Sequence, residues 1–164
     1  IDIAPTLTMY REANERFAKA YYHWFFLIQP EPLPEKLIGS NPDFYLKFKL
    51  SNASAGMKPF SRKALEEYLR CYRNPQTLHA ICEDYRASNT IDLVHDEEDL
   101  KRMVECPLLV LWAENGVVEK YFDVLVEWRK RALDIRGKAL PGGHYLAEEL
   151  PELMCQEFIE FFSS

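Results

Sequence analysis

The sequence lacks several features that mark whole classes of protein. Its 20 Lys and Arg residues are scattered among 26 Asp and Glu residues, which leaves a net charge of −6 and no basic stripe. This balance argues against a nucleic-acid surface and against attraction to anionic membranes. The longest apolar run, residues 24–28, is far too short to cross a bilayer. We therefore expect a cytoplasmic protein that binds neither nucleic acid nor membrane.

Paired cysteine motifs are also absent from the sequence. The four cysteines form no Cys-x-x-Cys pair, and we expect reduced thiols, as in a cytosolic protein. His79 and His95 have no partner at metal-ligand spacing, and no zinc or calcium pattern is present. The sequence therefore predicts neither a metal nor a cofactor. It starts at Ile1 without a Met or a signal-peptide pattern, so we expect a processed chain or one cut from a longer one.

The first two thirds of the chain have helical patterns without an intervening strand. Apolar residues recur at three- and four-residue spacing, and Asn41, Ser61 and Asn74 precede such segments as typical helix caps. We expect helices over residues 10–28, 35–38, 42–50, 61–73, 75–87 and 90–103.

The pattern changes after residue 104. Residues 106–112 and 135–140 are apolar runs that predict two strands, the second weaker than the first, and residues 121–133 and 151–162 are amphipathic helices. The layout predicts three parts. We assign residues 1–5 to the end of a core strand, 6–104 to a helical block and 105–164 to a β-α-β-α tail.

His144 is the strongest candidate for a catalytic residue. It follows Gly142-Gly143, between the second predicted strand and the last helix. Histidine transfers protons near neutrality, and glycines allow a neighbouring side chain to enter a cleft without steric clash. This is the position of the general-base histidine that ends an α/β-hydrolase chain. However, the sequence contains no Gly-x-Ser-x-Gly or Gly-x-Asp-x-Gly nucleophile turn.

Longer segments resemble one family within that fold. They are His23-Trp24-Phe25-Phe26, Gln29-Pro30, Leu33-Pro34-Glu35, Asn41-Pro42-Asp43-Phe44-Tyr45, Cys82-Glu83-Asp84-Tyr85-Arg86-Ala87 and Gly143-His144-Tyr145-Leu146. Together they are similar to the haloacetate (fluoroacetate) dehalogenases, over nearly the whole chain. The resemblance implies an α/β-hydrolase fold, represented here by the helical cap followed by the last two strands and helices of the core sheet.

The resemblance also implies roles for individual residues. His144 matches the general base and Asp2 the triad carboxylate, while His23, Trp24 and Tyr85 match cap residues that hold the leaving halide. The family's Asp nucleophile lies in a half that this sequence does not contain. The residues alone leave a second candidate for the triad acid, Glu114, because other α/β hydrolases place it after the corresponding strand.

Two functional hypotheses follow from these observations. The first is hydrolysis of a halogenated short-chain acid through an Asp nucleophile, an ester intermediate and a His-activated water, with an epoxide hydrolase or another α/β hydrolase as alternatives. The second is a non-catalytic fragment or subunit. Two strands cannot cover their own edges. We therefore expect the missing N-terminal half on the same or a separate chain, leave a homodimer open, and expect this chain alone to be inactive.

Overall fold

The computed structural model describes residues 1–163, which begin with a helical region and end with a small α/β region. The helical region contains α1 (Thr6–Arg11), α2 (Glu15–Ala20), α3 (Tyr22–Leu27), α4 (Leu33–Ser40), α5 (Pro42–Asn52), α6 (Arg62–Tyr72), α7 (Pro75–Ser88), α8 (Ile91–Glu98) and the 3-10 turn η1 (Asp99–Lys101). The second region contains β1 (Leu108–Ala113), α9 (Val117–Tyr121), α10 (Val124–Arg129), β2 (Ile135–Leu140), α11 (Leu146–Glu149) and α12 (Pro151–Ser163).

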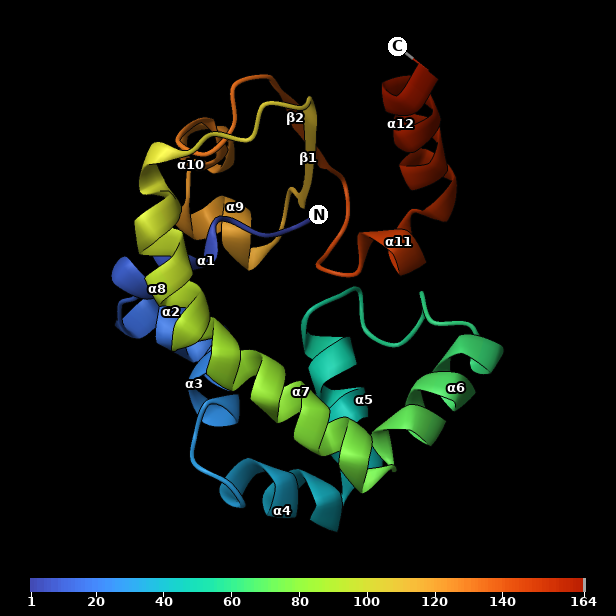
Figure 1. Ribbon diagram of the computed structural model, residues 1–164. Helices are drawn as coiled ribbons and strands as arrows, with labels where there is room; N and C mark the ends of the chain where they lie inside the picture. The colour runs from blue at the N-terminus through green and yellow to red at the C-terminus, as the bar shows by residue number, and fades with distance from the viewer. Residues whose placement is uncertain (164) are drawn as a thin grey trace.

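The two strands are parallel and are covered on both faces. Leu108 pairs with Ile135, and the register continues to Ala113 opposite Leu140. Alternate side chains of β1 enter different apolar clusters: Trp112 packs with residues of α9 and α10, whereas Leu111 packs with residues of α11 and α12. Figure 1 shows α9 and α10 on one side of the strands and α12 on the other. This two-sided burial explains the continuous apolar run of β1.

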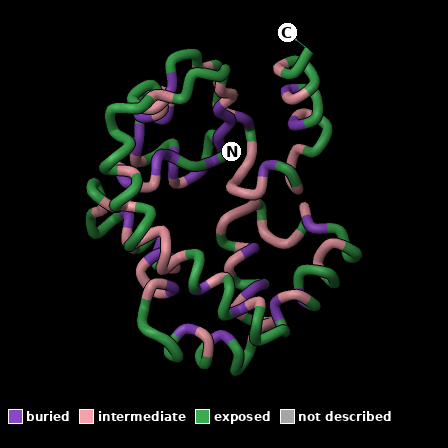
Figure 2. The backbone as a smooth tube through the Cα atoms, in the orientation of Figure 1, coloured by how far each residue is buried: buried purple, intermediate pink, exposed green. Residues whose placement is uncertain are grey.

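The helical region has its own apolar cluster, built around α7. This helix crosses the region diagonally in Figure 1 and packs against α3, α4 and α6. Figure 2 shows buried positions on inward-facing turns of these helices, with exposed positions on the outer turns. The cluster consists of Leu27, Ile38, Leu46, Leu50, Phe60, Leu69, Tyr72, Leu78 and Cys82. The predicted caps are confirmed, because the side chains of Asn41, Ser61 and Asn74 accept hydrogen bonds from the first turns of α5, α6 and α7.

The predicted helix over residues 10–28 is wrong. The structure divides this segment among α1, α2 and α3, with breaks at Asn14 and Tyr21. The Asn14 side chain accepts a hydrogen bond from the Phe17 N–H and so starts a new helix. The apolar spacing survives the breaks, because Phe17, Tyr21 and Trp24 still join one buried aromatic cluster. Periodicity alone could not reveal the interruption.

Two further predictions need correction. The segment 121–133 is not one helix, because Asp123 caps α10 by accepting from the Val126 N–H, while α9 ends at Tyr121. Residues 1–5 form no strand, although the Asp2 N–H donates to the carbonyl of Leu111 in β1 at 2.7 Å.

Within residues 1–163, no helix is long and apolar enough to cross a membrane.

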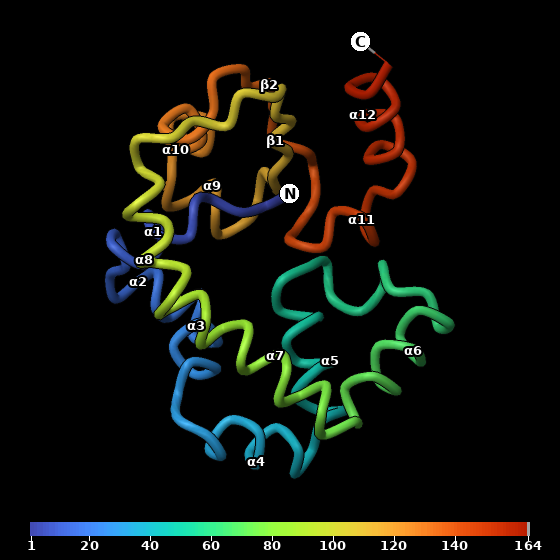
Figure 3. Tube along the Cα trace, viewed as in Figure 1, coloured from blue at the N-terminus to red at the C-terminus, as the bar shows by residue number. Residues whose placement is uncertain are grey.

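The two regions meet at a pair of loops. The loop after α5 approaches the loop between β2 and α11, as the trace in Figure 3 shows. The His144 N–H donates to the Ala53 carbonyl at 2.8 Å, which joins the α/β region to the helical region through the backbone. Residues 141–145, called the histidine loop below, are therefore positioned by both regions.

Candidate active site

Asp2 and His144 are in direct contact although 142 residues separate them in sequence. The Asp2 Oδ2 atom lies 2.7 Å from His144 Nδ1. Asp2 is buried, whereas the His144 side chain is about one third exposed. When Nδ1–H donates to Asp2, the other ring nitrogen, Nε2, is left as a hydrogen-bond acceptor that can take a proton. The contact therefore fixes the orientation of the imidazole and leaves Nε2 as the ring nitrogen that can act as a base.

Asp2 itself is fixed by the end of β1. Its Oδ1 atom accepts a hydrogen bond from the Ala113 N–H at 2.9 Å, and its own N–H donates to the Leu111 carbonyl. The backbone of Asp2 is in the left-handed region, with φ at 47°. A non-glycine residue there is strained, and such strain persists only where the surroundings impose it. Both carboxylate oxygens are occupied, so Asp2 is suited to orient a histidine rather than to attack a substrate.

The structure distinguishes between the two candidates for the carboxylate partner. Asp2 reaches His144, whereas Glu114 is exposed just beyond β1. The turn that follows β1 leaves little space near Asp2, because a Cβ on Gly116 would lie 2.9 Å from the Ala113 Cβ and 3.3 Å from Asp2 Oδ1. Glycine at this position therefore allows the turn to pass close to the buried carboxylate.

Glu149 stabilises the histidine loop through a hydrogen bond that the sequence did not reveal. Its Oε2 atom accepts from the Gly143 N–H at 2.9 Å, and a Cβ on Gly143 would meet Glu149 Oε1 at 2.8 Å and the Ala53 carbonyl at 3.0 Å. Glu149 is therefore partly buried against this loop rather than fully solvated. The close approach, rather than a positive φ, is what requires glycine before His144.

His23 belongs to the helical region and lines the same cleft as His144. It lies on α3, half-buried, and its ring contacts the Tyr85 ring at 5.9 Å. Burial, with additional repulsion from Lys49 and His144, lowers the pKa of His23 to about 3. The imidazole is therefore neutral at physiological pH and has one N–H to donate.

This pKa shift leads to a prediction about stability. The pKa of His23 is lower in the folded protein than the ordinary 6.5. As the pH falls, this histidine is therefore protonated in the unfolded state at a higher pH than in the folded state. Stability from this group is fully present above pH 6.5 and is lost as the pH falls towards 3. Between pH 7.5 and 5.0 the wild type should lose about 2 kcal/mol more unfolding free energy than His23→Gln. Urea unfolding at both pH values measures this difference, and equal losses would contradict the shifted pKa.

The Tyr85 ring contacts both the His23 ring and the Trp24 ring. The Trp24 ring is buried and its centroid lies 6.4 Å from that of Tyr85, which comes from α7. The Tyr85 hydroxyl accepts a hydrogen bond from Lys49 Nζ at 3.5 Å. The three predicted leaving-group residues thus meet, and the sequence missed Lys49 beside them. A signal was present, since Lys49 follows Leu46 by three residues and so lies near the apolar face of α5.

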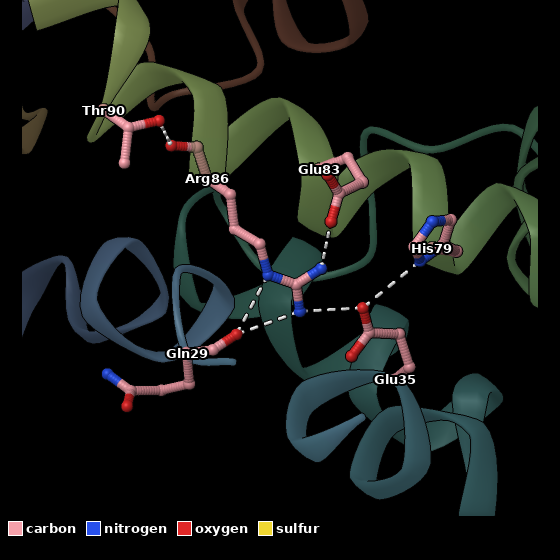
Figure 4. Close-up of polar contacts among 6 residues, drawn as sticks. All are labelled: Gln29, Glu35, His79, Glu83, Arg86 and Thr90. Carbon is pink, nitrogen blue, oxygen red and sulfur yellow. Dashed lines mark hydrogen bonds and ion pairs between the residues drawn. The ribbon is translucent and has the colours of Figure 1, made fainter. Parts of the chain in front are cut away.

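Arg86, next to Tyr85, ties α7 to the rest of the cap. Its guanidinium lies 2.8 Å from Glu35 Oε1 on α4, and its Nε and Nη2 donate to the Gln29 carbonyl at 3.0 and 2.9 Å (Figure 4). His79, which is exposed on α7, lies 3.5 Å from the same Glu35 oxygen. These contacts hold the helix that carries Tyr85 against the end of the helix that carries His23.

A cleft of about 460 Å³ lies between the two regions. Its walls include His23, Lys49 and Ala53 from the helical region and Gly116, Lys120, His144 and Glu149 from the α/β region. Trp24 and Tyr85 are not among the residues within 1–163 that line this cleft. No group of His, Cys, Asp and Glu side chains within residues 1–163 could hold a metal ion. The cleft thus combines an oriented base with neutral and cationic donors.

Comparisons with known proteins show which proteins this chain is similar to. A fluoroacetate dehalogenase from Burkholderia sp is 40% identical over 164 residues, which cover 99% of this chain and 54% of that protein. A crystal structure from Nostoc sp PCC 7120, described as an alpha/beta hydrolase, has a TM-score of 0.96 at 53% identity and covers 98% of this chain and 55% of its own. A Pseudomonas aeruginosa structure, described as an epoxide hydrolase, has a TM-score of 0.92 at 35% identity, with coverages of 99% and 55%.

No family model matches the chain. The chain nevertheless has the α/β-hydrolase fold, of which it represents the helical cap and the C-terminal part of the core, as the sequence predicted. Within that fold, its resemblance to the haloacetate dehalogenases is confirmed for these parts. The chain spans about half the length of the relatives it matches.

Proposed function

We propose that this chain forms the cap and C-terminal half of a hydrolase that cleaves the carbon–halogen bond of a halogenated short-chain acid. The observation that carries the proposal is the contact of His144 with the buried Asp2, across a cleft from the cap donor His23. The identity to a fluoroacetate dehalogenase supports the choice of substrate. In this proposal His144 is the general base, Asp2 orients it, and His23, Trp24 and Tyr85 form the leaving-group site.

The proposed reaction has two steps. An aspartate oxygen from the N-terminal half attacks the carbon that bears the halogen, a carbon–oxygen bond forms, and the halide leaves with the electron pair of the broken bond. A water then attacks the carbonyl carbon of the aspartyl ester while His144 Nε2 takes its proton. The ester bond to the hydroxy acid breaks, and the proton on His144 passes to the leaving alkoxide. The aspartic acid formed in this step releases its remaining proton to solvent. The aspartate carboxylate is thereby regenerated.

Aspartates within this chain do not offer an alternative nucleophile. Asp2 has both oxygens engaged, and no other aspartate within residues 1–163 directly follows β1 or β2. We therefore propose that the nucleophile comes from the N-terminal half of the fold, on the same or a separate chain. The cap side of the cleft and the histidine loop are the parts contributed by the residues described.

The direct test is halide release by the complete protein. Fluoroacetate and chloroacetate should both yield hydroxyacetate and one halide ion, measured with ion-selective electrodes. No release from either acid, together with hydration of a small epoxide to a diol, would replace this proposal by the epoxide hydrolase alternative, which the description of the Pseudomonas aeruginosa structure favours. No turnover of any such substrate would favour a non-catalytic role.

Tyr85→Phe should impair fluoride release more than chloride release. Fluoride is small and strongly hydrated, so its departure depends more on donated hydrogen bonds in a dry site. Loss of one such donor should lower the rate for fluoroacetate by about 10²- to 10³-fold and the rate for chloroacetate by less. Stopped-flow halide release with both substrates measures the ratio. Tyr68→Phe, whose hydroxyl bonds to Glu148 at the surface, is a matched control that should change neither rate. Equal losses for both halides would contradict a leaving-group role.

A further inference from the structure

Lys49 is a half-buried cation on the cap wall of the cleft. It lies near the end of α5, and burial lowers the pKa of its ammonium group. Its Nζ atom donates to the Tyr85 hydroxyl at 3.5 Å and lies 5.6 Å from the centroid of the same ring. Lys49 lines the cleft together with His23 and His144. The ammonium group is therefore anchored by an aromatic side chain and accessible from the site.

The contacts of Lys49 with the described part of the chain involve aromatic and imidazole groups. Within residues 1–163, no Asp or Glu oxygen lies within ion-pair distance of it. Asp2 bonds to His144 and Ala113, and Glu149, which lines the cleft, accepts from the Gly143 N–H through its Oε2 atom. The neighbours of the ammonium are a phenol, Tyr85, and an imidazole, His23, that is neutral. Partial burial of a cation is costly, and an anionic ligand in the cleft would offset that cost.

We propose that Lys49 supplies the positive charge that receives the departing halide, and that this charge determines how well fluoride leaves. The inference rests on the proposed function and extends it to a residue outside the predicted trio. Displacement at carbon requires the leaving group to lie opposite the attacking oxygen. The nucleophile belongs to the core sheet, so the carbon–halogen bond points towards the cap, where Lys49 meets Tyr85. Lys120 also lines the cleft, but it is exposed and its charge is screened by solvent.

The test replaces Lys49 by Met, which keeps the length of the side chain and removes its charge. In the complete enzyme, Lys49→Met should lower the rate of fluoride release by about 10²-fold, and that of chloride release by less than about tenfold. Lys49→Arg should recover part of the fluoride rate, because the charge is restored. Lys47→Met, on the exposed side of the same helix, is the matched control and should leave both rates unchanged.

A second measurement does not depend on turnover. Titration with sodium fluoride or sodium chloride, followed by Trp fluorescence, should give a halide Kd at least about tenfold weaker in Lys49→Met than in the wild type. Circular dichroism verifies the fold of each variant, and Lys49→Gln replaces any variant that fails this check.

The possible outcomes are distinguishable. Unchanged rates and unchanged halide affinity in Lys49→Met would overturn the proposal. Equal losses for both substrates through a raised KM would also overturn it, because Lys49 would then bind the substrate carboxylate. In both cases the wild type still releases halide, and the proposed function stands. A wild type that neither releases nor binds halide would overturn both proposals.

Discussion

Substitution of His144 by Gln is expected to stop steady-state turnover of the complete enzyme while leaving the first halide release nearly intact. Displacement of halide by a carboxylate needs no base, because no proton is transferred in that step. Hydrolysis of the ester does need a base, because water is a poor nucleophile unless its proton is removed. His144 is the cleft residue whose Nδ1 is held by Asp2, which leaves Nε2 free for that proton. Loss of the base should lower turnover by about 10²- to 10⁴-fold.

The measurement is a time course of chloride release at micromolar enzyme concentration. His144→Gln should give a burst of one equivalent followed by almost no further release, whereas the wild type should continue. His95→Gln, an exposed histidine on α8, is the matched control and should behave as the wild type. Multiple turnovers at the wild-type rate in His144→Gln would rule out His144 as the base.

Asp2→Asn is expected to have a comparably large effect with little structural change. The amide oxygen can still accept from the Ala113 N–H, so the backbone contact that fixes residue 2 is preserved. The amide nitrogen would then face His144 Nδ1 as a donor and would favour the tautomer with hydrogen on Nε2. That tautomer cannot take a proton from water. In a triad of this kind, the wrong tautomer lowers kcat by about 10⁴-fold.

Pre-steady-state kinetics should locate this loss in the second step. Ester formation should remain near the wild-type rate, and ester hydrolysis should slow by the full factor. Glu114→Gln is the comparison that separates the two candidates for the triad acid, since Glu114 is exposed and should be dispensable. A large loss in Glu114→Gln with normal activity in Asp2→Asn would reverse the proposed assignment.

Local sequence signals predicted much of the architecture. The β2 strand and the starts of α5, α6 and α7 follow from short patterns, because an apolar run or a capping side chain acts on its immediate neighbours. The continuous helix over residues 10–28 failed for the same reason. The apolar spacing was correct. However, the Asn14 side chain accepts a local hydrogen bond from the Phe17 N–H, and this favours the start of a second helix over continuation of the first.

The candidate site was less predictable, because its contacts join distant segments. The Gly-Gly-His loop identified His144, but the backbone strain at Asp2 and the bond from His144 to Ala53 depend on how the cap meets the core. Lys49 and Glu149 carried charges that ordinarily indicate a solvated surface. Only the tertiary structure shows that Lys49 turns into the cleft and that Glu149 secures the histidine loop.

The central claim, an aspartyl ester hydrolysed through His144, can be tested by the intact mass of the complete His144→Gln enzyme after incubation with fluoroacetate or chloroacetate. The account predicts that the mass rises by one carboxymethyl group, which peptide mapping places on an aspartate of the N-terminal half. The wild type should show no lasting modification. An unmodified His144→Gln enzyme that still consumes substrate, or a carboxymethyl group on Asp2, would contradict the account.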